Sequence, residues 1–325
     1  MTTLALALLL AISPCLPAAA QPPPSAPSAS AGHDATVLLF HPVDKDEVDP
    51  FGVPFEGADA FSVRYQALTA QTGQFDYPVF VADGVRAIQA LPNATRPYQG
   101  TVEAYEAAFA ARQAAAVPLA LTLRATVAEG QARLQVHAEP DAPIQESQGQ
   151  RLHLRIALAE DPVHYQPPAP VSNGIVDHRF TVRAYHDAGP IALTAAANRT
   201  VSIPLDPSWR IEHLLAAAWV QADGTPGRFA PTEVLQSTHA SLDGATVHQS
   251  GKGVLVEVYS ATWCTPCLYG DLAAEQVALR HAGAQELASP STRYLEAPSH
   301  PLLAVLLAAA VGLAVAFLPR GGKHL

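Results

Sequence analysis

Residues 253–267 read GVLVEVYSATWCTPC. The run 254–260 is apolar and rich in valine, which predicts a buried β-strand. Two cysteines spaced C-x-x-C, Cys264 and Cys267, follow this run almost at once. Apolar residues then recur at helical spacing as far as residue 281, which predicts a helix that begins at the cysteine pair. The stretch therefore predicts a strand, a short turn carrying two cysteines, and a helix.

The position of the two cysteines favours redox chemistry. A cysteine at the start of a helix lies near the positive end of the helix dipole, which lowers its pKa and raises its thiolate fraction. A second cysteine three residues later can resolve a mixed disulfide formed by the first. Pro266 falls in the first helical turn, where the missing N–H of a proline matters least.

Two other interpretations of the pair remain open. A purely structural disulfide is one, although so small a loop stabilises a fold only modestly. A zinc site is the other, but it needs a second ligand pair, and no second C-x-x-C is present. Leu268 follows the pair, so the haem-attachment pattern is absent. We interpret His164, His178 and His186 as surface or hydrogen-bonded histidines, and the sequence predicts neither a metal nor a cofactor.

The segment GVLVEVYSATWCTPC resembles the strand and active-site segment of extracytoplasmic, membrane-anchored oxidoreductases of the thioredoxin-like superfamily. The resemblance implies that Cys264 is an exposed nucleophile and that Cys267 is a buried resolving thiol. It also implies that Trp263 is a flanking contact residue in a substrate groove.

A fold of that family needs a further strand, helix and cis-proline hairpin, and residues 33–116 offer candidates for them. Tyr77 and Pro78 precede VFVADGV, in which Asp83-Gly84 indicates a tight turn between two strands. The resemblance implies a cis peptide bond before Pro78, with Tyr77 and Pro78 lining the groove. An ordinary trans proline that opens an edge strand is the alternative. The other candidates are a strand at 36–41 and helices at 60–70 and 101–116.

Residues 117–245 contain short alternating strands separated by Pro, Gly and Asp turns, which predicts an Ig-like β-sandwich. The expected fold class is therefore α+β. It combines a split or circularly permuted thioredoxin-like α/β domain, an inserted β-sandwich and one C-terminal transmembrane helix. In the alternative, residues 33–116 form a separate, degenerate domain.

The two ends of the chain predict its compartment. An apolar run followed by Ala18-Ala19-Ala20 is typical of a cleaved signal peptide at 1–20, and an uncleaved anchor is the alternative because no Lys or Arg precedes the run. The segment 301–318 carries no charge and is long enough to span a bilayer, although a buried Ala-rich helix is the alternative. Arg320 and Lys323 fit a cytoplasmic end. The ends together predict a membrane-anchored protein with its bulk in the periplasm or at the cell surface.

Charge excludes one class of function. The chain has 19 basic and 29 acidic residues, a net charge of −10, and no basic cluster, so nucleic-acid binding has no electrostatic basis.

The expected organisation is a signal peptide (1–20), a Pro-rich linker (21–32), a thioredoxin-like part (33–116), a β-sandwich (117–245), a second thioredoxin-like part (251–283), a connector (284–300), a transmembrane helix (301–318) and a cytoplasmic tail (319–325).

The sequence supports two hypotheses of different classes. The first is a thiol–disulfide oxidoreductase in which Cys264 and Cys267 act on exported protein thiols or disulfides, with an unidentified redox partner. The second is a non-catalytic cell-surface binding module in which the β-sandwich binds a partner and the C-x-x-C bridge is structural. An exposed, reactive Cys264 favours the first hypothesis, and a buried, inert bridge favours the second.

Overall fold

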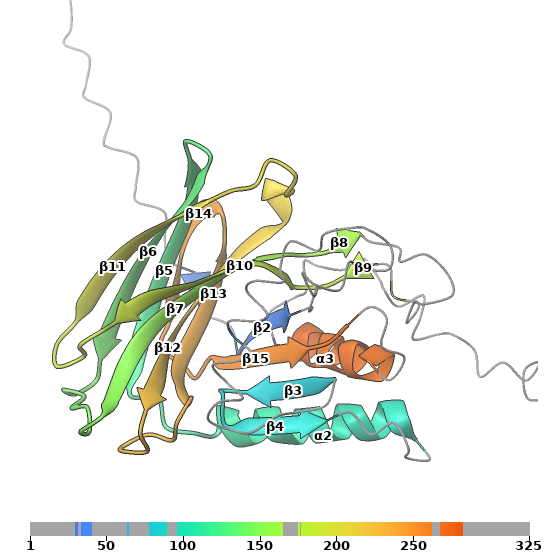
Figure 1. Ribbon diagram of the computed structural model, residues 1–325, viewed down its shortest axis with the longest axis horizontal. Coiled ribbons are helices and arrows are strands. Elements are labelled where there is room, and N and C mark those ends of the chain that lie inside the picture. Colours follow the sequence, from blue (N-terminus) through green and yellow to red (C-terminus); the bar gives the residue numbers. More distant parts are fainter. Residues whose placement is uncertain are drawn as a thin grey trace, which may run out of the picture.

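The computed structural model shows a protein built mainly of β-sheet (Figure 1). In its described part there are two α-helices, α2 (Pro97–Gln113) and α3 (Cys267–His281), and one 3-10 turn, η1 (Ile211–His213). The residues that the structure describes are 30–31, 34–40, 64, 78–89, 96–164, 175, 177–261 and 267–281.

The first sheet has five strands and forms one layer of a sandwich. Hairpin β5–β6 is its centre, and the turn at Glu129-Gly130 has positive φ at both residues, 54° and 71°, as a tight hairpin turn requires. Buried and exposed side chains alternate along both strands, as expected for a sheet with one face in the core. The strand order is β1 (Ser30–Ala31), β14 (Asp243–Gln249), β5 (Leu119–Ala128), β6 (Gln131–Pro140) and β11 (Ala197–Pro204).

The second sheet has eight strands, and these come from segments at both ends of the described part of the chain. Its order is β13 (Val234–Ser241), β12 (Leu214–Gly224), β7 (Gln150–Glu160), β10 (Thr181–Pro190), β2 (Ala35–Phe40), β15 (Val254–Tyr259), β3 (Val79–Ala82) and β4 (Arg86–Gln89). A separate small hairpin pairs β8 (Val163–His164) with β9 (Asp177–His178).

The joint between the two halves of this sheet is narrow. Strands β10 and β2 run parallel and pair at a single register position, Thr181 opposite Leu39. The Leu39 N–H donates to the Phe180 carbonyl at 2.8 Å. Beyond this joint, β2 and β15 pair in parallel over six positions. The joint therefore connects an antiparallel half to a mixed half.

One face of the eight-stranded sheet is covered by two different layers. Leu39, Thr181 and Glu160 share a face because they are directly paired across neighbouring strands. On the antiparallel half this face packs against the five-stranded sheet, and Leu158 belongs to the hydrophobic core between the two sheets. On the mixed half it packs against α2 and α3, through residues such as Val258 and their helical partners. The seam between the two layers lies near β10 and β2.

The opposite face of the same sheet buries a third core around a charged side chain. Arg64 is fully buried, and its Nε and Nη2 donate to the two Glu257 carboxylate oxygens at 2.5 and 2.8 Å. Its Nη1 donates to the Gln221 side-chain oxygen at 2.7 Å, and its guanidinium lies 5.6 Å from the centre of the Trp219 ring. The Tyr259 hydroxyl donates to Glu257 at 3.1 Å. Each nitrogen of the Arg64 guanidinium and both carboxylate oxygens of Glu257 thus have a hydrogen-bond partner.

The local predictions were confirmed within a few residues. The predicted strands at 36–41 and 254–260 are β2 and β15, and the predicted helix at 101–116 is α2. The predicted hairpin is β3–β4, with Asp83 and Gly84 both at positive φ, although its loop has three residues instead of two. The predicted helix at 60–70 lies outside the described residues except for Arg64.

The expected fold class is wrong. The strands assigned to a thioredoxin-like α/β domain, β2, β3 and β15, do not form a sheet of their own, because they continue the sheet of β7, β10, β12 and β13. Only α2 and α3 accompany them in the described part of the chain. The pattern of strand, cysteine pair and helix is local, whereas a fold class depends on which distant strands pair.

The expected transmembrane helix is also not supported. Among the described residues, no helix has the length and apolar character needed to cross a membrane. The segment 301–318 itself lies outside the described residues, as do the predicted signal peptide at 1–20, the connector at 284–300 and the tail at 319–325.

Candidate functional site

Cys267 is the first residue of α3 and is disulfide-bonded. Its side chain is completely buried and packs against Ala261, which follows β15. Cys264, Trp263 and Tyr77 lie outside the described residues. Their predicted roles in a nucleophilic site and groove remain sequence-based.

Pro78 is buried against the first turns of α3. A Cβ added at Gly270 would lie 2.7 Å from Pro78 Cγ and 3.3 Å from the Tyr105 hydroxyl of α2. The chain before β3 therefore touches the helix that begins at Cys267, and glycine is the residue that lets them approach. The described cis peptide bond is Asp161-Pro162, and the bond before Pro78 involves Tyr77, which is not described.

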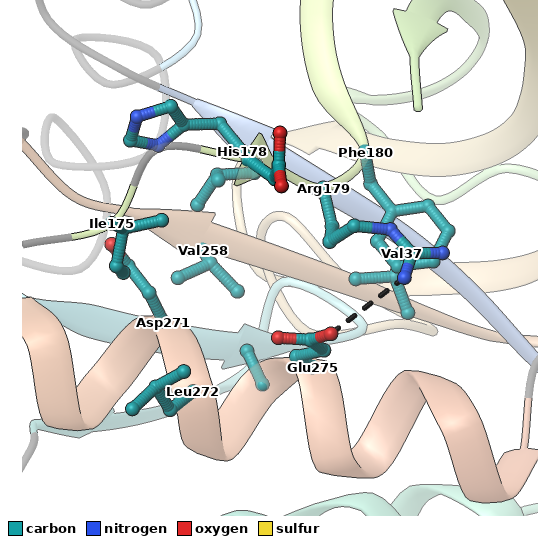
Figure 2. A pocket seen from close by; sticks show the side chains of 12 residues that line it. Val37, Ile175, His178, Arg179, Phe180, Val258, Asp271, Leu272 and Glu275 are labelled. Atoms are coloured by element: carbon teal, nitrogen blue, oxygen red, sulfur yellow. Dashed lines mark ion pairs between the residues drawn. The ribbon is translucent and has the colours of Figure 1, made fainter. Parts of the chain in front are cut away.

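A cavity lies between α3 and the turn that leads into β10 (Figure 2). Its empty volume is about 380 Å³, including its mouth to solvent. The floor comes from α3, one wall from β2 and β15, and the roof from β9 and the turn into β10. Most of the lining is apolar, contributed by Val37, Leu39, Ile175, Phe180, Val258, Leu272 and Ala274.

Asp271 is the unusual group in this cavity. It follows Cys267 by four residues, so both lie on the buried face of α3. Neither of its carboxyl oxygens has a hydrogen-bond partner. Burial raises the pKa of Asp271 to about 7, and the nearby charge of Glu275 adds to this effect. The hydroxyl of Ser260 opposes the shift, although the two groups do not make a hydrogen bond of regular geometry.

Two hydroxyl groups near Asp271 share its lack of hydrogen bonds. Tyr105 Oη is buried without a partner, and desolvation followed by the charge of Asp271 raises the pKa of this phenol. Ser260 Oγ is likewise buried without a partner. Buried polar groups are normally hydrogen-bonded, so three neighbouring groups that lack hydrogen bonds mark this part of the structure as a candidate functional site.

The other charged groups of the cavity are paired. Arg179 donates from Nε and Nη2 to the two oxygens of Asp161 at 2.5 and 2.9 Å. Its Nη1 lies 3.6 Å from Glu275, the contact drawn as a dashed line in Figure 2. Asp177, at the rim, lies 2.8 Å from His164. Because one guanidinium faces several carboxyl groups, the cavity has an acidic excess.

A possible metal-binding group lies elsewhere, on the antiparallel half of the sheet. Ligand atoms of His153, Asp187 and Asp223, on the adjacent strands β7, β10 and β12, lie within 4.8 Å of one another. However, the guanidinium of Arg155 contacts Asp223 closely and lies 3.9 Å from Asp187. A resident cation therefore already neutralises these carboxylates. His186 is exposed, His164 makes a surface ion pair, and His178 is buried at the cavity.

Sequence reasoning missed Asp271 and Arg179. The available signal for Asp271 was a charged residue on the small-residue stripe of α3 that includes Gly270 and Ala274. No sequence signal marked Arg179, because its role depends on the turn that carries it over the helix.

Comparison with known proteins gives no family. No family model matches the chain, and no curated protein matches it. Among solved structures it is similar to HBP35 of Porphyromonas gingivalis, with 17% identity, 57% of this chain and 59% of that chain covered, and a TM-score of 0.42. It is also similar to a DUF3823 family protein from Bacteroides ovatus, with 11% identity, 42% and 57% coverage, and a TM-score of 0.23. A third likeness is to beta-glucosidase 3B from Thermotoga neapolitana in complex with glucose, with 12% identity, 41% and 16% coverage, and a TM-score of 0.18. The chain thus spans about three fifths of the length of HBP35.

The expected membership of the thioredoxin-like superfamily was wrong. The described part of the chain is rich in sheet and has two α-helices, and the strands assigned to that fold continue an eight-stranded sheet. The assignment as an oxidoreductase, which rested on that resemblance and on the position of the cysteine pair at a helix start, is not supported, because the described strands do not form a thioredoxin-like domain. What the structure offers is a β-rich scaffold with a buried disulfide-bonded cysteine and an adjacent cavity.

Proposed function

We propose that the protein is a non-catalytic extracytoplasmic binding module, with a structural disulfide at Cys267 and a binding site in the cavity beside α3. The observation that carries the proposal is the unpartnered carboxyl of Asp271 in a cavity whose lining is mostly apolar. Small-molecule and side-chain sites are concave, mostly apolar, and supplied with a few polar groups that orient the ligand. The cavity between α3 and the turn into β10 has this character, with a mostly apolar lining and a few charged groups.

Within this proposal the disulfide has a structural role, with which the burial of Cys267 agrees; both hypotheses expect Cys267 to be buried, so the reactivity of Cys264 decides between them. Reactive cysteines are low-pKa and partly exposed, whereas buried ones are inert. We propose that the partner of Cys267 is Cys264, since the two are the C-x-x-C pair of the sequence. In this role the bridge fixes the entry of α3, and α3 forms the floor of the cavity.

The extracytoplasmic location is supported by two features. The first 20 residues have the apolar run and small-residue site of a signal peptide. Disulfides persist in oxidising compartments and are rare in the cytosol, and Cys267 is disulfide-bonded.

The experiment has a catalytic arm and a binding arm. In the first, the full chain and its Cys264→Ser/Cys267→Ser variant are compared in a dithiothreitol-driven insulin reduction assay. We expect both to leave the background rate unchanged. A rate enhancement by the wild-type chain that the double variant loses would overturn the non-catalytic assignment.

The binding arm uses ligand-detected NMR with a library of uncharged, cationic and anionic fragments. We expect wild-type binders that are lost in Leu272→Trp, because Leu272 is a half-buried residue of the cavity lining. The control is Leu279→Trp, which changes a half-buried leucine of the same helix away from the cavity. Equal binding by both variants would remove the cavity from the proposal.

A further inference from the structure

We propose that the cavity binds an alkylammonium group, the chemistry of a lysine side chain or a free aliphatic amine, with Asp271 as its counter-ion. This inference rests on the proposed function and specifies its ligand. The ammonium group would lie at Asp271, and its alkyl chain would lie along the apolar lining.

The charge of the cavity selects a cation. Asp271 and Glu275 both line the cavity, and Asp161 accepts a hydrogen bond from Arg179. Arg179 directs two of its N–H donors at Asp161 and lies near Glu275, so its charge is already balanced. An anionic ligand would meet an excess of carboxyl groups, whereas a cation would compensate the one that has no partner.

The number of unsatisfied groups fits an ammonium. An R-NH₃⁺ group has three donors and no acceptor. Asp271 lines the cavity and has no hydrogen bond, and the buried hydroxyls of Tyr105 and Ser260, which lie near enough to be coupled to the ionisation of Asp271, also have none. Tyr105 comes from α2 and Ser260 from the end of β15, and they do not line the cavity themselves.

The walls fit an alkyl chain. Val37, Val258 and Phe180 present apolar surface from β2, β15 and the turn before β10. Figure 2 shows Val258 between Asp271 and Arg179, with Leu272 on the helix below. A lysine stem buries its methylene groups along such surface while its charged end seeks a polar partner.

The ionisation of Asp271 gives the site a characteristic pH dependence. The titratable and charged groups around this carboxyl are Glu275 on α3, Tyr105 on α2, and Arg179, His178 and Asp177 on the roof. A group with a pKa of about 7 is half protonated at neutral pH, and only its ionised form is a counter-ion for ammonium. Affinity should therefore rise between pH 6 and pH 8.

The test is a calorimetric titration of the full chain with n-butylamine and with Nα-acetyl-lysine amide, which separate a free amine from a lysine side chain. n-Butanol and butyrate are the matched neutral and anionic probes. We expect saturable binding of at least one amine, at least tenfold tighter than that of butanol, and severalfold tighter at pH 8 than at pH 6. Asp271→Asn should abolish this preference, and Asp141→Asn, at an exposed aspartate, should leave it unchanged.

Three results would overturn the inference. One is equal affinity for butylamine and butanol, another is unchanged amine binding in Asp271→Asn, and the third is no binding of either amine. If uncharged fragments bind and are lost in Leu272→Trp, the binding module survives without this ligand. If Nα-acetyl-lysine amide alone binds, the natural ligand is a protein side chain.

Discussion

The ring of Pro78 lies directly on Gly270, so that a single added methyl group at Gly270 would approach Pro78 Cγ to 2.7 Å. Two segments far apart in the sequence, the entry to β3 and the first turns of α3, are thereby held in contact. This contact sits between the buried Cys267 and the carboxyl of Asp271 on the same helix.

The first prediction concerns this contact. Gly270→Ala should lower the free energy of unfolding by about 1–3 kcal/mol through overpacking, although alanine alone would favour the helix by about 1 kcal/mol. Urea unfolding followed by circular dichroism measures the difference. Gly251→Ala is the control, since nothing lies within 4 Å of a Cβ there. A stabilised Gly270→Ala variant would show that Pro78 can move aside freely.

The second prediction concerns pH and stability. The pKa of Asp271 is about 7 when folded and 3.8 in its ordinary state, so between these values the folded chain holds a proton that the unfolded chain has lost. Stability should therefore be greatest below pH 3.8 for this group and fall as pH rises to about 7, by roughly 4 kcal/mol in total. In Asp271→Asn this fall should disappear, whereas in Asp141→Asn it should persist. Thermal unfolding from pH 4 to pH 8 measures it, and parallel profiles for wild type and Asp271→Asn would contradict the prediction.

The third prediction concerns the buried ion pair on the other face of the sheet. Arg64→Ala leaves Glu257 buried with its charge uncompensated, which should cost about 3–5 kcal/mol. Arg64→Met/Glu257→Leu removes both charges and should recover most of that loss. Chemical unfolding of the single and double variants measures the coupling.

For comparison, Arg280→Ala removes an exposed pair with Glu106 and should cost at most about 1 kcal/mol. An equal loss of unfolding free energy in Arg64→Ala and Arg280→Ala would mean that burial does not increase the cost of breaking an ion pair.

The fourth prediction concerns the disulfide. If Cys267 pairs with Cys264, the closed loop is very short, and its removal in Cys264→Ser/Cys267→Ser should cost only about 2 kcal/mol. Peptide mapping under non-reducing conditions identifies the partner, and unfolding measures the cost. The amine affinity of the cavity should change little, because the floor of the cavity is α3 itself. Loss of the whole cooperative transition would assign the bridge a larger role.

The parts of the fold that could be predicted from the sequence are those with a local pattern. Alternation in 119–125 and the apolar run at 254–260 identify strands because their side-chain period is local. The pairing of β10 with β2 could not be predicted, since it depends on one register position, Thr181 opposite Leu39, between segments far apart in the chain. That pairing decides whether the chain builds one sheet or two domains, and the family resemblance favoured the wrong answer.

The candidate site was predictable only in part. The sequence identified the cysteine pair and the helix that follows it. Asp271 becomes significant because the turn carrying Arg179 and Phe180 covers it, and this covering turn is positioned by the ion pair with Asp161. Because the burial of Asp271 depends on three separate segments, no sequence pattern within any one of them predicts it.

The central place of β2 in the eight-stranded sheet has a consequence for folding. Its two neighbours, β10 and β15, come much later in the chain. During synthesis the apolar strand ATVLLF is complete long before β10 (Thr181–Pro190) and β15 (Val254–Tyr259), with which it pairs. Such an unpaired strand is a template for aggregation. The chain therefore exposes an aggregation-prone strand during folding until β10 and β15 have formed.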